Sequence, residues 1–101
     1  MPFMIDATDK PKSEALRRDT RPEHLAFLER SLPKLLACGA KLRDDCETAW
    51  GSFYIVDVED RASAEAFIND DPFSKAGLFE TVAISRWRKG FFNFAKVPPK
   101  S

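Results

Sequence analysis

The chain contains a single histidine, His24, which is the residue best suited to acid–base chemistry in this sequence. An imidazole can take a proton from a carbon or a hydroxyl group and return it near neutral pH. On a helical wheel His24 lies at the edge of a stripe of leucines, so part of its ring can face a cavity. A helix that begins just before it would disfavour the imidazolium, which suits a base. His24 is therefore a candidate general base, and a packed histidine bonded to a backbone carbonyl is the alternative.

Three other polar residues are candidates for binding a substrate. Ser52 opens an apolar segment and could present its hydroxyl group to a cavity, or it could simply end a turn after Gly51. Arg17 and Arg21 flank the start of the His24 helix and could clamp a carboxylate or a phenolate. A solvated basic pair at a helix end is the alternative for these arginines.

The two cysteines, Cys38 and Cys46, do not form a redox or metal-binding pair, since their spacing is not CxxC and no second histidine completes a zinc site. Neither has a convincing base beside it in the sequence, which disfavours a nucleophilic role. Since a small secreted domain would usually carry more cysteines, we expect reduced thiols in a cytoplasmic protein, and the N-terminus resembles no signal peptide. The sequence has no GxGxxG motif or phosphate-binding loop, so we predict no cofactor and no metal.

Length and charge limit the possible partners. The 101 residues fit one domain, spanning 1–101, with a basic and aromatic tail over about 89–101. Sixteen basic residues balance sixteen acidic ones, so nothing in the net charge attracts nucleic acid or an anionic membrane. In the tail, basic residues alternate with Phe91, Phe92 and Phe94, which could stack on a single nucleic-acid strand. Burial against a second copy of the chain fits the neutral net charge better.

The first half of the chain has signals for a strand and a helix. Residues 2–8 alternate apolar and polar side chains, which predicts a strand. Thr20 and Glu23 match a capping box, with Pro22 in the first turn, and predict a helix that begins near Arg21. The apolar stripe continues through Leu25, Leu28, Leu32, Leu35 and Leu36, with a kink at Pro33, and predicts a helix end near Cys38 and Gly39.

The second half predicts a short strand and loop over 40–52, a central strand over 52–58, a helix over 60–70, a helical turn over 72–77 and a last strand over 79–87. The order strand, helix, strand, strand, helix, strand predicts a ferredoxin-like α+β fold, with four antiparallel strands and both helices on one face. Since the central strand is apolar on both faces, we expect a second copy of the chain to cover the open face.

Four segments together resemble the YciI-like (YCII-related) family: RPEHL at 21–25, Gly51-Ser52, DDPFSKAGL at 70–78 and ISRWR at 84–88. The resemblance implies a ferredoxin-like subunit that forms dimeric α+β barrels. It also implies an active site centred on a histidine and an aspartate, which fall on His24 and Asp71. Dehydrochlorinase-type chemistry on ring compounds has been attributed to some members, and related barrels include isomerases and monooxygenases.

The resemblance gives Asp71 the role of orienting the imidazole and stabilising its charged form. Asp71 precedes Pro72, so it could instead cap the next helical turn, and its four acceptor sites allow both roles. Asp70 is the alternative if the register shifts. The chain departs from the family where Gly39 is followed by Ala40 rather than proline, in a short acidic loop, and where Arg86 replaces a proline. The expected function is cofactor-independent elimination or isomerisation, with a non-catalytic binding or accessory module as the alternative.

Overall fold

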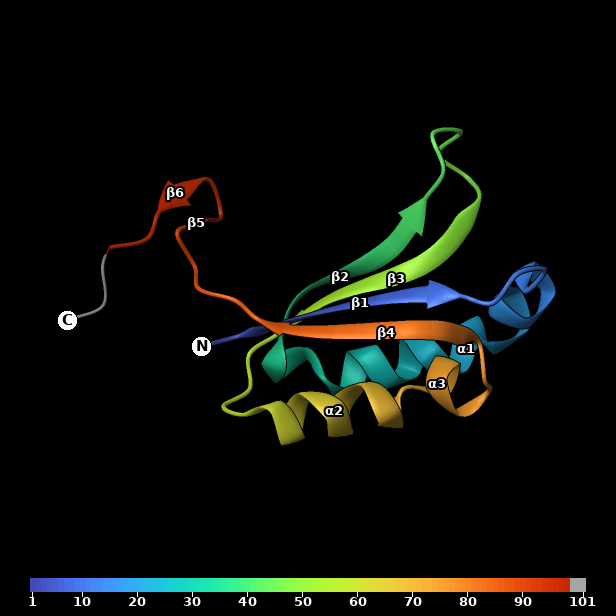
Figure 1. Cartoon of the computed structure of the whole chain (residues 1–101), viewed down its shortest axis with the longest axis horizontal. Coiled ribbons are helices and arrows are strands. Elements are labelled where there is room, and N and C mark those ends of the chain that lie inside the picture. Colours follow the sequence, from blue (N-terminus) through green and yellow to red (C-terminus); the bar gives the residue numbers. More distant parts are fainter. Residues whose placement is uncertain (99–101) are drawn as a thin grey trace.

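The computed structural model describes residues 1–98 as one sheet with helices on one of its faces (Figure 1). In chain order, the elements are β1 (Phe3–Asp9), α1 (Glu14–Arg30), the 3-10 helix η1 (Leu32–Lys34), β2 (Leu35–Leu42), β3 (Ala49–Val56), α2 (Arg61–Asp70), α3 (Pro72–Lys75), β4 (Phe79–Arg86), β5 (Phe91–Phe92) and β6 (Ala95–Lys96). The end of the predicted tail, 99–101, lies outside the described residues.

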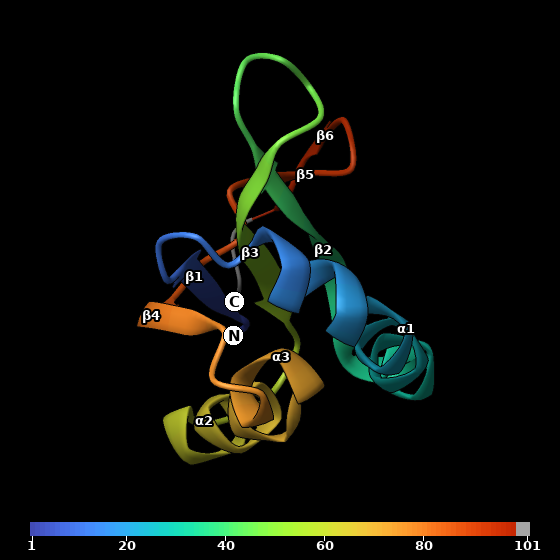
Figure 2. The same cartoon turned by 90° about the vertical axis from the view of Figure 1, so that its right-hand side faces the viewer.

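The four long strands form an antiparallel sheet in the order β2-β3-β1-β4, which confirms the predicted ferredoxin-like topology. Figure 1 shows α1 and α2 below this sheet, with no helix above it, and Figure 2 shows the same arrangement end-on, with α1 beside the sheet and α2 below it. The alternation along β1 follows from this one-sided cover. Phe3, Ile5 and Ala7 are buried between the sheet and the helices, whereas Met4 and Asp6 lie on the open face and stay partly exposed.

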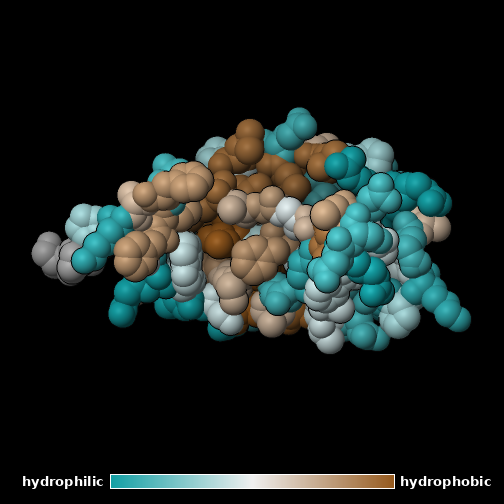
Figure 3. Space-filling view, turned by 90° about the horizontal axis from the view of Figure 1, so that it is seen from above, coloured by the Kyte–Doolittle hydropathy of each residue, from teal (hydrophilic) through white to brown (hydrophobic). Residues whose placement is uncertain are grey.

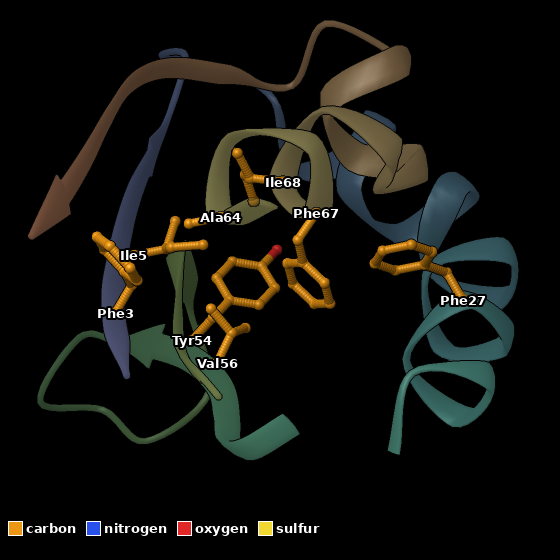
Figure 4. Close-up of a cluster of buried hydrophobic side chains, with 8 residues drawn as sticks. All are labelled: Phe3, Ile5, Phe27, Tyr54, Val56, Ala64, Phe67 and Ile68. Carbon is orange, nitrogen blue, oxygen red and sulfur yellow. The ribbon is translucent and has the colours of Figure 1, made fainter. Parts of the chain in front are cut away.

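The core lies between the sheet and the helices. Figure 4 shows Tyr54 at its centre, between the β1 side chains and Phe27 of α1. Its members come from two strands and both long helices: Phe3, Ile5, Phe27, Tyr54, Val56, Ala64, Phe67 and Ile68. Tyr54 is the only one that carries a polar group into this cluster, so its hydroxyl group needs a partner there.

The first predicted helix was wrong at both ends. It begins at Glu14, about two turns before the expected start, so Thr20 does not cap it and Pro22 lies in its interior. The charged segment that precedes Thr20 is rich in good helix formers, and one exposed proline did not override them. His24 consequently lies in the middle of α1, and the expected influence of a helix N-terminus on the imidazole does not apply.

The leucine stripe does not continue as a helix beyond Arg30. After η1 the chain enters β2, so Leu35 and Leu36 belong to a strand that pairs with β3. Apolar residues that suit a helix face also suit a strand, and the pairing partner decides between them. The central strand is also shifted from the predicted 52–58 to Ala49–Val56. The second helix was predicted correctly: Asp60 caps it by accepting a hydrogen bond from the Ser63 backbone.

Candidate active site

The structure brings His24 and Asp71 into direct contact. Nδ1 of His24 lies 2.8 Å from Oδ1 and 3.0 Å from Oδ2 of Asp71, although the two residues are 47 positions apart. Both side chains are buried. The Phe73 ring stacks on the imidazole with 3.8 Å between ring centroids, which fixes the plane of the ring. The histidine is therefore held in one orientation from two directions.

Asp71 both caps α3 and contacts the histidine. Its Oδ1 accepts a hydrogen bond of 2.9 Å from the Phe73 backbone N–H at the start of α3. Its Oδ2 accepts a hydrogen bond of 2.6 Å from the Tyr54 hydroxyl group. The cap and the contact with the imidazole coexist, since each oxygen accepts from a different donor as well as lying within hydrogen-bond distance of Nδ1. Asp70 is exposed and takes no part in these contacts.

Tyr54 is a member of the site that the sequence alone did not single out. Burial raises the pKa of its hydroxyl group far above the ordinary value, and the negative charge of Asp71 raises it further. Tyr54 is thus a permanent hydrogen-bond donor. The available signal was a tyrosine within an otherwise apolar central strand, because a buried tyrosine requires a partner.

These contacts determine which nitrogen of His24 can act. An ionised carboxylate only accepts hydrogen bonds, so Nδ1 carries the proton and donates it to Asp71. Nε2 then has a free lone pair. Because His24 lines a cavity of about 170 Å³, that lone pair is available to a molecule bound there. A general base with an orienting carboxylate would require this geometry.

Arg17 is a second buried polar group beside the histidine. Its guanidinium donates to both oxygens of Asp9, at 2.7 and 3.0 Å, and to Oγ of Ser52 at 2.8 Å. It also lies 4.7 Å from the centroid of the Phe73 ring. The side chain is only 11% exposed. All these bonds use Nε and Nη2, so within residues 1–98 Nη1 has no hydrogen-bond partner and can serve a ligand.

Ser52 and Arg21, the two candidate substrate-binding residues, both line the cavity but differ in their surroundings. Ser52 is buried, and its hydroxyl group already accepts the hydrogen bond from Arg17. Arg21 is exposed at the mouth, where the cavity adjoins a larger hollow of about 490 Å³. The walls of the smaller cavity are Arg17, Arg21, His24, Leu25, Leu28, Cys38, Gly39, Ala40, Ser52 and Phe73.

Cys38 lines the cavity but is poorly suited to act as a nucleophile. Burial raises the pKa of its thiol to about 11, with a smaller contribution from the charge of Asp71. The reactive form of cysteine is the thiolate, so this thiol is largely inert near neutral pH. Among residues 1–98, no three side chains that could ligate a metal converge. The described helices are also too short or too polar to cross a membrane.

Comparison with known proteins links this geometry to one family. A sequence model of the YCII-related domain matches residues 1–88. Protein YciI of Escherichia coli O6:H1 and of Shigella flexneri are each 32% identical to this chain, over 90% of its length and 100% of theirs.

A solved structure with a similar fold is 5-chloro-2-hydroxyhydroquinone dehydrochlorinase from Burkholderia phenoliruptrix, in complex with 2,5-dihydroxybenzoquinone. It is 36% identical in sequence and superimposes with a TM-score of 0.82, over 89% of this chain and 96% of that one. The similarity therefore extends over nearly the whole of both chains.

Proposed function

Since the chain belongs to the YCII-related domain family, we propose that it is a small enzyme in which His24 removes a proton from a small substrate without a cofactor. The observation that carries this proposal is the buried contact between His24 and Asp71 beside a cavity. A packed histidine needs only one partner, whereas this ring is oriented, stacked and left with Nε2 on the cavity side. That extra organisation is expected of a catalytic group.

The cavity suits a single-ring anionic molecule. Its 170 Å³ is below the roughly 300–1,000 Å³ of sites for drug-sized ligands. Arg17 would hold a phenolate or carboxylate through Nη1, while the Phe73 ring beneath it offers an apolar wall. Arg21 at the mouth would attract the same charge. Ser52 acts through Arg17, by accepting one of its hydrogen bonds.

In the proposed step, Nε2 takes a proton from the substrate while Asp71 stabilises the imidazolium that forms. For an elimination, the electron pair left on the substrate forms a new double bond and expels an anion such as chloride. For an isomerisation, the imidazolium returns the proton to a different atom. The named activity of the Burkholderia protein supports elimination from a chlorinated, hydroxylated ring.

A non-catalytic binding module is the second candidate. It is favoured by one observation: within residues 1–98, every side-chain nitrogen or oxygen atom that is itself completely buried has a hydrogen-bond partner, so the polar cluster also makes sense as core structure. In that case the cavity would bind a small anion without turning it over.

The two candidates are separated by giving the protein 5-chloro-2-hydroxyhydroquinone and measuring chloride release, with 2,5-dihydroxybenzoquinone as a ligand in calorimetry. The wild type should release chloride, and His24→Asn should slow this release by about 10² to 10⁴-fold while still binding the quinone. Leu32→Ser, on the exposed η1, is the matched control and should leave the rate unchanged. Binding of the quinone without chloride release, or equal rates in His24→Asn and the wild type, would reject the catalytic role.

We further propose a homodimer in the cytoplasm. Met4, Phe53 and Ile55 lie on the open face of the sheet, and Figure 3, which views that face, shows an apolar region at its centre. A second copy would remove this patch from water. Light scattering of the intact protein should give twice the mass of one chain, and a monomer at micromolar concentration would contradict the dimer. The free thiols of Cys38 and Cys46 suit a reducing compartment, which cell fractionation would test.

A further inference from the structure

The chain continues past the sheet into a short aromatic arm, residues 87–97. Its β5 and β6 form a hairpin that projects from the body of the molecule (Figure 1). Phe91 is 75% exposed and Phe94 is 108% exposed, the largest values among the exposed large apolar side chains of residues 1–98. Trp87 and Phe92 contact each other with 6.2 Å between ring centroids, which gives the arm a small packed base. Two phenylalanines this exposed on one short hairpin are unusual in a monomer.

The arm is not explained by the fold that the family shares. The family match ends at residue 88, and the similar proteins cover about nine-tenths of this chain. A hairpin of this size has little stability of its own in water. Its turn also places Asn93 and Phe94 at φ of 56° and 63°, a region that a bulky residue rarely adopts. Nothing within residues 1–98 compensates for this cost by covering Phe94.

The position of the arm indicates what it contacts. In Figures 1 and 2 the arm and the loop between β2 and β3 both rise above the open face of the sheet, at opposite ends. The open face therefore lies between two projections. A second copy that covers this face in the antiparallel direction would bring its arm to the loop end of the first copy.

The two projections have opposite charge. Residues 86–98 contain four basic residues and no acidic one: Arg86, Arg88, Lys89 and Lys96. The loop over 43–48 contains three acidic residues and one basic residue: Asp44, Asp45, Glu47 and Arg43. Hydrogen bonds from Thr48 and Glu47 lower the pKa of Asp45 to about 2, so its charge is permanent. Beside the loop, Trp50 is 40% exposed and offers apolar surface to an aromatic side chain, whereas the exposed Leu42 lines the hollow beside α1.

We propose that the arm docks on a second copy of this chain, with Phe91 and Phe94 against Trp50 of that copy. Lys89 and Lys96 then face its acidic loop. The inference rests on the dimer proposed above and adds the relative direction of its two sheets. The sheets are antiparallel, so the arm of each copy reaches the 43–48 loop of the other copy. In such a two-fold pair each contact occurs twice, and one substitution removes both.

The first test measures the dimer dissociation constant by sedimentation equilibrium for the full chain. Changing both exposed phenylalanines of the hairpin, in Phe91→Ser with Phe94→Ser (the tip variant), should weaken the dimer by about 100-fold or more, since two aromatic anchors are lost from each contact. Leu32→Ser is the control, because Leu32 is 64% exposed on the helical side and should change the constant by no more than about threefold. A monomeric wild type would overturn both the dimer and the arm. A dimeric wild type with an unchanged constant in the tip variant would overturn the arm alone.

A charge exchange tests the direction of docking. Lys89→Glu with Lys96→Glu should weaken the dimer by roughly 10-fold, and Asp44→Lys with Glu47→Lys should do the same. The combination of all four changes should restore it, because the attraction is re-formed with reversed signs. No recovery in the combined variant would overturn the proposed pairing. Anisotropy of a labelled oligothymidylate tests the other class of partner: tight binding that the tip variant loses, with the dimer unchanged, would reassign the arm to nucleic acid.

Discussion

Replacing Asp71 offers the sharpest test of the site, because asparagine and alanine should separate its structural role from its chemical one. In Asp71→Asn, one oxygen remains to accept from the Phe73 backbone. The new amide group can donate to Nδ1 of His24, but it cannot accept the hydrogen bond from the Tyr54 hydroxyl group. The histidine proton moves to Nε2, so the lone pair is lost from the cavity side.

The magnitudes follow from these contacts. Asp71→Ala leaves three donors without an acceptor in a buried position: the Tyr54 hydroxyl group, the Phe73 N–H and Nδ1–H of His24. At about 1–3 kcal/mol for each orphaned donor, unfolding should become easier by about 3–9 kcal/mol, out of a typical total of about 5–15 kcal/mol. Asp71→Asn leaves one of these donors, the Tyr54 hydroxyl group, without its acceptor and should cost about 1–3 kcal/mol. Its effect on turnover should be far larger, roughly 10⁴-fold, as expected for a histidine held in the wrong tautomer.

Two measurements check this reasoning. Urea unfolding followed by tryptophan fluorescence gives the free energies, with Leu32→Ser as a surface control. The ¹⁵N shifts of the imidazole report which nitrogen carries the proton, and the assignment is unambiguous because His24 is the only histidine. An Asp71→Asn variant that keeps the wild-type tautomer or the wild-type rate would refute the proposed role of the carboxylate. A loss below 1 kcal/mol in Asp71→Ala would refute the count of buried donors.

Three further outcomes are expected. Gly51→Ala should destabilise the protein by about 1–3 kcal/mol in urea unfolding, because its new methyl group meets Lys41 and a backbone carbonyl of β1. Gly39→Ala is the control and should have little effect, since the space around Gly39 is open. Iodoacetamide at pH 8 should modify the exposed Cys46 well before Cys38, as peptide mass mapping would show; equal rates would contradict the buried thiol. Folding raises the pKa of Cys38 from about 9 to about 11, so its stabilising contribution is complete below about pH 9 and is lost as the pH rises to about 11. The free energy of unfolding of Cys38→Ala should therefore fall less steeply between about pH 9 and 11 than that of the wild type.

Local sequence signals determined a large part of the fold. Alternation predicted β1, the Asp60 cap predicted α2, and the Asp71–Pro72 step predicted the break before α3, because each signal depends on neighbouring residues only. The errors fell where two local signals competed. The capping box at Thr20 lost to helix-forming residues before it, and the leucines after Arg30 entered a strand because β3 offered them hydrogen bonds.

The sequence by itself determined which residue types were available for the site: one histidine, and an aspartate that follows a helix. The resemblance to a family pointed to the same pair. Only the tertiary structure decided that Tyr54 donates to Asp71, and that Arg17 is locked by Asp9 beside the cavity. These contacts join a helix, two strands and a helix junction, and their distances depend on strand order and on how α1 packs against the sheet. No local pattern encodes such distances, because they are set by burial of the whole core.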